Sequence, residues 1–115
     1  MEKKHTYFVD IDGTIFVYRK FDTYLTTEAV VIKSSKQFLQ RKRDEGHMIV
    51  LTTARPNDLR LHTEYELGVN NIPYDYLLMG IERGPRYLIN DLDPNAEGKR
   101  AIAINVLRDE GIKNH

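Results

Sequence analysis

Tyr7-Phe8-Val9-Asp10-Ile11-Asp12-Gly13-Thr14 is the stretch that decides the fold. It is an apolar run, typical of a buried strand, that ends in two acids one residue apart. Because residues i and i+2 of a strand point to the same side, we expect Asp10 and Asp12 to project together from the strand's carboxyl end. Two like charges this close repel unless a cation or a division of roles relieves them. The stretch therefore predicts a catalytic or cation-binding site at the end of this strand.

The chemistry that suits this pair is a nucleophile and a general acid/base acting on a phosphate ester. One carboxylate can attack phosphorus to give an aspartyl-phosphate. A second carboxylic acid two residues on can protonate the leaving oxygen and later activate water. Mg²⁺ is the predicted cofactor, since it prefers carboxylate and phosphate oxygens. Gly13 lets the backbone turn sharply, and the N–H groups beside it can face a phosphate.

Asp-Ile-Asp-Gly-Thr after an apolar strand resembles the first motif of the haloacid dehalogenase (HAD) superfamily of Mg²⁺-dependent phosphohydrolases. The resemblance implies that Asp10 is the nucleophile and Asp12 the general acid/base, with the Asp12 backbone carbonyl also offered to the metal. An EF-hand calcium loop fits less well, because it needs glycine at its sixth position and here glycine is fourth. A structural turn of Asp, Gly and Thr is the other alternative.

A second strand end carries hydroxyls. Met48–Leu51 is a continuous apolar run, as expected of a parallel strand, and Thr52-Thr53-Ala54-Arg55 follows it. A hydroxyl here, next to a helix N-terminus, can bind phosphate. The family's second motif is a hydrophobic strand closed by Thr or Ser, and the resemblance points to Thr53 as the phosphate ligand, with Thr52 as the alternative.

A third strand end carries acids again. Tyr87–Ile89 is apolar and leads through Asn90 into Asp91-Leu92-Asp93-Pro94. Asp91 stands where the family's fourth motif supplies a metal-binding carboxylate, so the implied Mg²⁺ ligands are Asp10, Asp12 and Asp91. Asp93 either binds the metal through water or belongs to a turn.

The family's third motif is a basic residue upstream of that strand, normally lysine. No lysine lies between Lys42 and Lys99, so the chain departs from the usual pattern. Arg83 and Arg86 are the candidates for the phosphate-binding cation, since arginine makes the same electrostatic contact with bidentate geometry.

The order of elements predicts the fold. Further strands are expected at Tyr76–Met79 and Ala101–Asn105, with helices from Thr26 or Thr27 to near Gly46 and from Pro56 to about Gly68. Alternation of strands and helices predicts an α/β fold with ligands at the carboxyl ends of the strands. We expect one domain, residues 1–115, with a three-layer Rossmann-like (HAD-like) parallel sheet flanked by helices. The resemblance adds a β-hairpin flap after the first strand and leaves no room for a cap domain.

Composition limits the class of protein. Of the 115 residues, 41% are hydrophobic and 30% charged, which fits a globular enzyme. The 17 basic residues balance the 17 acidic ones, which argues against a polynucleotide partner without excluding a local basic groove. There are no cysteines for disulfides or thiolate zinc sites. The absence of a signal or membrane-spanning run makes a cytoplasmic protein with no membrane partner the expectation.

These features together predict a Mg²⁺-dependent phosphatase, acting through an aspartyl-phosphate on a phosphorylated small molecule such as a sugar phosphate. Because capless relatives can use a neighbouring subunit as a lid, a homo-oligomer is expected. The alternatives are a polynucleotide end phosphatase and a non-catalytic module of the same fold that binds phosphate or a protein.

Overall fold

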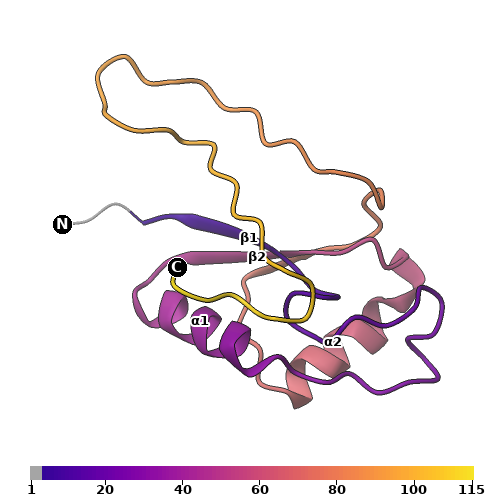
Figure 1. The fold of residues 1–115 in the computed structure, drawn as a ribbon. Helices are drawn as coiled ribbons and strands as arrows, with labels where there is room; N and C mark the ends of the chain where they lie inside the picture. Colours follow the sequence, from indigo (N-terminus) through magenta and orange to yellow (C-terminus); the bar gives the residue numbers. More distant parts are fainter. Residues whose placement is uncertain (1–3) are drawn as a thin grey trace.

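The chain folds around a small parallel sheet, seen in a computed structural model that describes residues 4–115 (Figure 1). Strands β1 (Thr6–Asp10), β2 (Met48–Thr52) and β3 (Tyr76–Leu78) lie in the order β1-β2-β3, all parallel. Helix α1 (Lys33–Asp44) connects β1 to β2, and the 3-10 turn η1 (Asn57–Leu59) with helix α2 (Arg60–Val69) connects β2 to β3. The predicted α/β, Rossmann-like fold without a cap domain is confirmed. The expected third layer is not formed by the described residues, because both helices lie on the same face of the sheet.

The hydrophobic core lies on one face of this sheet. Val9, Ile49 and Leu51 point into it, and all three are buried. Helices α1 and α2 cover this face, with Phe38 of α1 and Leu67 of α2 in the same cluster. Neither helix of the described residues is long and apolar enough to cross a bilayer.

The opposite face of the sheet, here named the open face, carries Phe8, Met48, Val50, Tyr76 and Leu78. Phe8, Val50 and Tyr76 stand side by side in the strand register. The exposed fraction is 56% for Phe8 and 61% for Tyr76, so this apolar face is not covered by the rest of the described chain. Asp10 lies two residues after Phe8 in β1 and therefore belongs to the same face.

The segment after β1 forms the predicted flap. The Val17 N–H donates to the Val30 carbonyl at 2.8 Å, and the Ile32 N–H donates to the Ile15 carbonyl at 2.8 Å, so two antiparallel stretches close its base. The prediction that α1 begins at Thr26 or Thr27 is wrong. Both hydroxyls donate to the Thr23 carbonyl instead, because Thr side chains compete for local backbone groups and favour turns.

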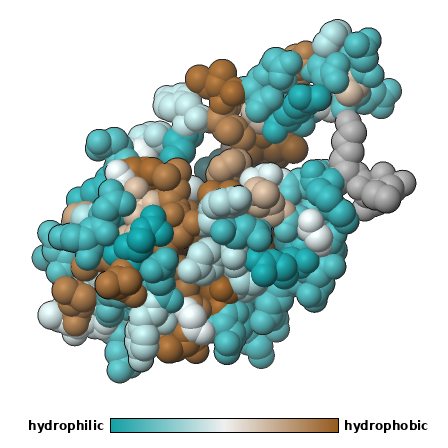
Figure 2. Space-filling model, turned by 180° about the vertical axis from the view of Figure 1, so that it is seen from behind, coloured by the Kyte–Doolittle hydropathy of each residue, from teal (hydrophilic) through white to brown (hydrophobic). Residues whose placement is uncertain are grey.

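The two strands expected at Tyr87–Asn90 and Ala101–Asn105 are not formed. Residues 87–107, here named the arm, leave the body on the side opposite the helices and return to it without regular structure (Figures 1 and 2). The radius of gyration is 14.9 Å, against about 13 Å for a compact domain of this length. A strand needs a neighbour for its backbone groups, and in the described chain neither segment pairs with one.

Candidate active site

The two motif acids meet at the carboxyl end of the sheet. Asp10 is the last residue of β1, and a tight turn follows in which Ile15 and Phe16 both donate to the Ile11 carbonyl, at 2.8 and 3.1 Å. Gly13 has a φ of +88°, a conformation that costs glycine little. The turn brings Asp12 back beside Asp10.

Both acids line a cavity of about 170 Å³. Its walls come from the ends of β1 and β2, the flap, and the two points where the arm leaves and rejoins the body. The lining residues are Asp10, Asp12, Tyr18, Phe21, Tyr24, Thr53, Ala54, Arg55, Arg83, Arg86 and Arg108. Four arginines thus face two carboxylates, which makes the cavity a site for an anion.

Asp12 is held by Arg55 in a two-point contact. The Arg55 Nε and Nη2 atoms donate to the two Asp12 carboxylate oxygens, each at 2.9 Å. Arg55 is completely buried and the Asp12 side chain is 11% exposed, so the pair is shielded from water. Paired and charge-assisted bonds of this kind are strong and fix orientation. Asp12 must release Arg55 before it can give up a proton to a leaving group.

A second buried acid supports this contact. Arg55 Nη1 donates to Glu66 at 2.7 Å, and Arg19 donates to both Glu66 oxygens at 2.9 Å. Burial raises the pKa of Glu66, but the hydrogen bonds from Arg19 and Arg55 outweigh it and hold that pKa below its ordinary value. The Tyr24 ring lies 4.3 Å from the Arg55 guanidinium carbon, and burial, helped by Asp12, raises the pKa of its hydroxyl to about 12.

Asp10 is the less constrained of the motif acids. Burial raises the pKa of its carboxyl, Arg86 opposes the shift, and the charge of Asp12 adds to it. Arg86 Nη2 lies 3.5 Å from one Asp10 oxygen, and Thr14 donates to the other at 3.4 Å. The Asp10 side chain is 38% exposed, so an oxygen with only these loose contacts faces the cavity.

The predicted phosphate ligands gather at the same cavity. Thr53 is buried, its N–H donates to Leu78, and its hydroxyl oxygen accepts from the Arg55 N–H at 3.1 Å, which leaves the hydroxyl proton available. Arg83 and Arg86 both line the cavity, and so does Arg108, which the sequence did not single out. Arg108 lies 3.9 Å above the Tyr18 ring, and Arg83 lies 4.4 Å above the Phe21 ring.

Asp91 is not part of this cavity. It lies on the arm with its side chain 74% exposed, 3.9 Å from Arg100. Asp93 accepts from the Asn95 N–H at 2.9 Å, which is a turn contact. Among the residues described, no three acids, histidines or cysteines come close enough to hold a metal ion. Since Arg55 occupies both Asp12 oxygens, one chain does not assemble the predicted Mg²⁺ ligands, and the metal stays a prediction.

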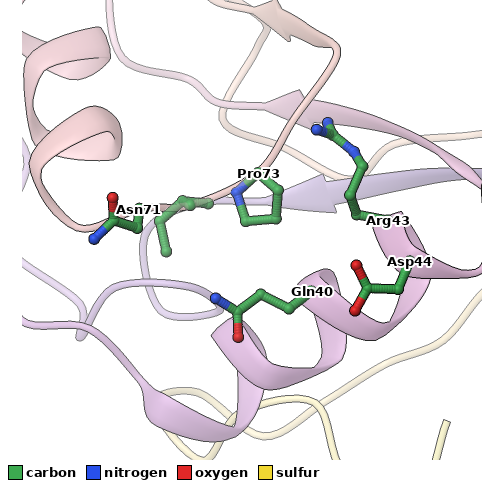
Figure 3. Close-up of a pocket in the computed structure, with 6 residues that line it drawn as sticks. Gln40, Arg43, Asp44, Asn71 and Pro73 are labelled. Atoms are coloured by element: carbon green, nitrogen blue, oxygen red, sulfur yellow. The ribbon is translucent and has the colours of Figure 1, made fainter.

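A second, larger hollow lies away from Asp10 and Asp12 and shares no lining residue with their cavity. It measures about 430 Å³ and opens between α1 and the loop before β3, where Gln40, Arg43 and Asp44 face Asn71 and Pro73 (Figure 3). Its arginine lies 3.4 Å from Asp75. The hollow has no pair of acids and no row of cations, so it offers no chemistry comparable with that around Asp10.

Sequence reasoning missed the residues that hold Asp12. Arg55 was visible as the residue two positions after Thr53, at a strand end, and that position was a usable signal. Arg19 and Glu66 had no such signal, because they come from the flap and from the middle of α2 and meet only in the folded chain.

Comparisons with known proteins agree with the fold. No protein-family model and no curated protein sequence matches the chain. A chain in the structure of the Pnkp1/Rnl/Hen1 complex is similar to it, with a TM-score of 0.59 and 26% identity over 73% of this chain and 30% of that one. A structure of the Pnkp1/Rnl/Hen1 RNA repair complex gives a TM-score of 0.58 and 27% identity over 72% and 27%.

A crystal structure from Vibrio cholerae has a TM-score of 0.55 at 19% identity, over 74% of this chain and 79% of that one, and shows a shared fold alone. The chain spans less than a third of the length of the two chains from the Pnkp1/Rnl/Hen1 structures.

Proposed function

We propose that the chain is a phosphate monoester hydrolase in which Asp10 is the nucleophile. One observation carries the proposal: Asp10 lines a cavity of about 170 Å³ together with Thr53 and with Arg83, Arg86 and Arg108. A phosphoryl group in the cavity would be held by Thr53 and by Arg83, Arg86 or Arg108. The resemblance of Asp10-Ile11-Asp12-Gly13-Thr14 to the HAD phosphohydrolases supports the same chemistry.

The reaction has two steps. An Asp10 oxygen attacks phosphorus, the ester P–O bond breaks, and its electron pair stays on the leaving oxygen. That oxygen takes a proton from Asp12, which must first leave Arg55 and take up a proton from solvent. Asp12 then removes a proton from water, the resulting hydroxide attacks the phosphorus of the aspartyl-phosphate, and the bond to Asp10 breaks to release inorganic phosphate. The arginines around the cavity stabilise the charge that builds on the phosphoryl oxygens.

Mg²⁺ belongs to the proposal as a cofactor, with Asp10 as its most accessible ligand. It would supply charge neutralisation between substrate and nucleophile.

The test is phosphate release from p-nitrophenyl phosphate with Mg²⁺ or with a chelator. Asp10→Asn should reduce release to background, and Asp12→Asn should reduce it by about 10²–10⁴-fold. Asp44→Asn, an acid of the far hollow, is the matched control and should keep full activity. Full activity in Asp10→Asn would overturn the proposal. Acid-quenched native protein should carry one added phosphoryl group by mass, and Asp10→Asn should carry none.

Polynucleotide ends are a second candidate substrate, beside the sugar phosphates expected from the sequence. The favouring observation is the two arginine–aromatic pairs, Arg83 with Phe21 and Arg108 with Tyr18, at the cavity wall. Such planes stack on bases, and arginine also contacts backbone phosphates. The similarity to chains in Pnkp1/Rnl/Hen1 structures, one of them an RNA repair complex, points the same way.

A substrate panel separates these possibilities. Oligonucleotides with a 3′- or 5′-phosphate should be cleaved faster than sugar phosphates if the stacked pairs bind nucleic acid, and the rate should fall with added salt. Arg108→Gln should then slow oligonucleotide hydrolysis by a larger factor than p-nitrophenyl phosphate hydrolysis, because only the oligonucleotide also loses a stacking contact. Equal rates for all esters would favour a small-molecule enzyme. Phosphate binding without hydrolysis of any ester would favour the non-catalytic module.

A further inference from the structure

Two apolar surfaces of the described chain have no partner. The open face of the sheet exposes four large side chains, those of Phe8, Met48, Tyr76 and Leu78. The arm exposes seven, those of Tyr87, Leu88, Ile89, Leu92, Ile102, Ile104 and Leu107, with Ile89 at 90%. Apolar side chains reach the surface on both the arm and the body in Figure 2. Exposed apolar area of this extent marks an interaction site.

The sheet also has a free edge next to the site. Among residues 4–115, β1 pairs only with β2, so its outer backbone groups are available for a further strand. The arm holds two segments, Tyr87–Asn90 and Ala101–Asn105, whose sequence favours strands and which pair with nothing in the described chain. An added strand at β1 would pair the free backbone groups of this edge with those of an arm segment.

We propose that the arm of a second copy of this chain adds to the free edge of β1, parallel to it, with its Asp91 beside Asp10. The register follows from this placement. With Asp91 level with Asp10, Ile89 lies beside Phe8 and Tyr87 beside Thr6, all on one face. The most exposed apolar residue of the arm then covers an exposed aromatic ring of the open face.

The contact of Arg86 with Asp10 is the reason to choose a second copy over the chain's own arm. A strand in this register puts Tyr87 about 13 Å from Asp91, at the far end of β1. Arg86 would then lie there too, beyond the reach of its side chain to Asp10, yet the guanidinium is 3.5 Å from that carboxylate. One chain therefore cannot keep this contact and deliver its own Asp91 by such a strand, whereas a second copy can.

The exchange of arms between two copies can be reciprocal. A two-fold pair in which each copy gives one arm and receives one would pair the Tyr87–Asp91 segment of both arms, and closed two-fold pairs are the commonest oligomers. Eleven exposed apolar side chains in each copy, seven from the arm and four from the face, are available for the contact. In its consequence for the site the inference rests on the proposed function, because the second copy's Asp91 would stand beside Asp10 as a second carboxylate open to Mg²⁺, while Arg55 holds both oxygens of Asp12.

Cysteine cross-linking tests the interface without any activity, because the chain has no cysteine of its own. Phe8→Cys and a tagged Ile89→Cys, refolded together and oxidised, should give a mixed disulfide dimer, since neighbouring strands bring paired residues within disulfide range. Leu61→Cys, on α2 and 82% exposed, replaces Phe8→Cys in the control and should give none.

The double variant Phe8→Cys/Ile89→Cys reports on the chain's own arm. A cross-linked dimer supports the exchange. A cross-linked monomer would mean that the arm closes on its own sheet, and an uncross-linked folded monomer would mean that the arm does not dock at all. Either result overturns the proposal. Both positions are more than half exposed, so the substitutions leave the core intact.

Mixing two inactive variants tests the shared site. Asp10→Asn and Asp91→Asn should each lack activity, and equal amounts refolded together should regain about a quarter of native activity, because half the pairs are mixed and each holds one complete site. No recovery would overturn the shared site. A dimer that cross-links while native protein releases no phosphate would reject only the proposed function. Active native protein that forms no cross-link would reject only the exchange.

Discussion

At the scale of single residues, the two carboxylates of the motif differ in the contacts that they make. Asp12 is fixed by the Arg55 guanidinium, whereas Asp10 keeps an exposed oxygen and only loose contacts. Burial of a charged group is costly unless it is paired and hydrogen-bonded, and Glu66 completes the pairing for Arg55. This division leaves Asp10 as the group available to attack.

Glu66→Gln tests how much the buried network contributes to stability. The change leaves Arg55 and Arg19 short of a counter-charge in the core, so the free energy of unfolding should fall by about 3–5 kcal/mol in urea titrations near neutral pH. Glu64→Gln is the control, since its partner Arg60 lies 3.7 Å away on the surface, and it should change stability by less than about 0.5 kcal/mol. Equal effects would mean that the network is not stabilising.

The native protein should also lose part of its stability in acid through Glu66. Its pKa is lowered in the folded state, so its contribution is present above the unfolded value of 4.5 and is lost as pH falls through the lower folded pKa. Urea titrations between neutral pH and pH 3 should show this loss in the native chain, and Glu66→Gln should show a smaller one. Identical pH dependence in both would contradict the assignment.

Activity should have an acid limb set by Asp10. Its folded pKa lies above the ordinary value of 3.8, and only the ionised carboxylate attacks, so log kcat/KM should rise with pH through that pKa. Because Arg86 lowers this pKa, Arg86→Gln should move the limb to higher pH. Arg43→Gln, whose partner is Asp75, should leave the limb in place. An unmoved limb in Arg86→Gln would show that the contact does not act on the nucleophile.

At the scale of elements, the sequence at the end of α1 sets where β2 begins. The last turn of α1, which ends at Asp44, carries Arg41, Lys42 and Arg43, and cations there oppose the negative end of the helix dipole. Gly46 follows in the left-handed region with φ +87°, and its N–H donates to the Arg43 carbonyl at 2.9 Å. The expectation of a glycine end to this helix is confirmed, and the turn leads directly into β2.

Two glycine-to-alanine changes should have opposite signs. Gly46→Ala forces a Cβ into the left-handed region and should cost about 1–2 kcal/mol. Gly68→Ala in α2 meets no neighbouring atom within 4 Å and should gain about 0.5–1 kcal/mol by improved helix propensity. Urea unfolding midpoints measure both. A loss of stability in Gly68→Ala would mean that the surface of α2 at this position is not free.

At the scale of the whole molecule, a compact body carries an arm that does not pack on it. A sheet of three strands with one uncovered face is small for a chain of 115 residues. Nine residues of strand-favouring sequence outside the core, four in Tyr87–Asn90 and five in Ala101–Asn105, are unusual for an isolated chain, whereas they are expected in a chain whose fold is completed by association.

Thermal stability should therefore depend on protein concentration. If copies exchange arms, the melting temperature should rise over a hundredfold increase in concentration, because association stabilises the folded state by mass action. Phe8→Lys places a charge on the open face at the proposed contact and should abolish this dependence while leaving the helical circular dichroism unchanged. A native melting temperature that does not move with concentration would contradict the association.

From the sequence we predicted the parallel α/β core and named Asp10, Asp12, Thr53, Arg83 and Arg86 as site residues, and in the structure these five residues line one cavity. This was possible because apolar periodicity and strand ends are local properties, and parallel strands bring their carboxyl ends to one edge. The sequence also predicted strands at Tyr87–Asn90 and Ala101–Asn105, which have the composition of strands but no neighbour in the chain.

Two features are visible only in the folded chain. Arg55, supported by Glu66 and Arg19, holds Asp12, and Asp91 lies away from Asp10. Both depend on contacts between segments far apart in the chain: 43 residues separate Asp12 from Arg55, and 47 separate Arg19 from Glu66. Local pattern sets which residues are available for such contacts. The packing of the flap on α2, and the course of the arm away from β1, set which contacts are made.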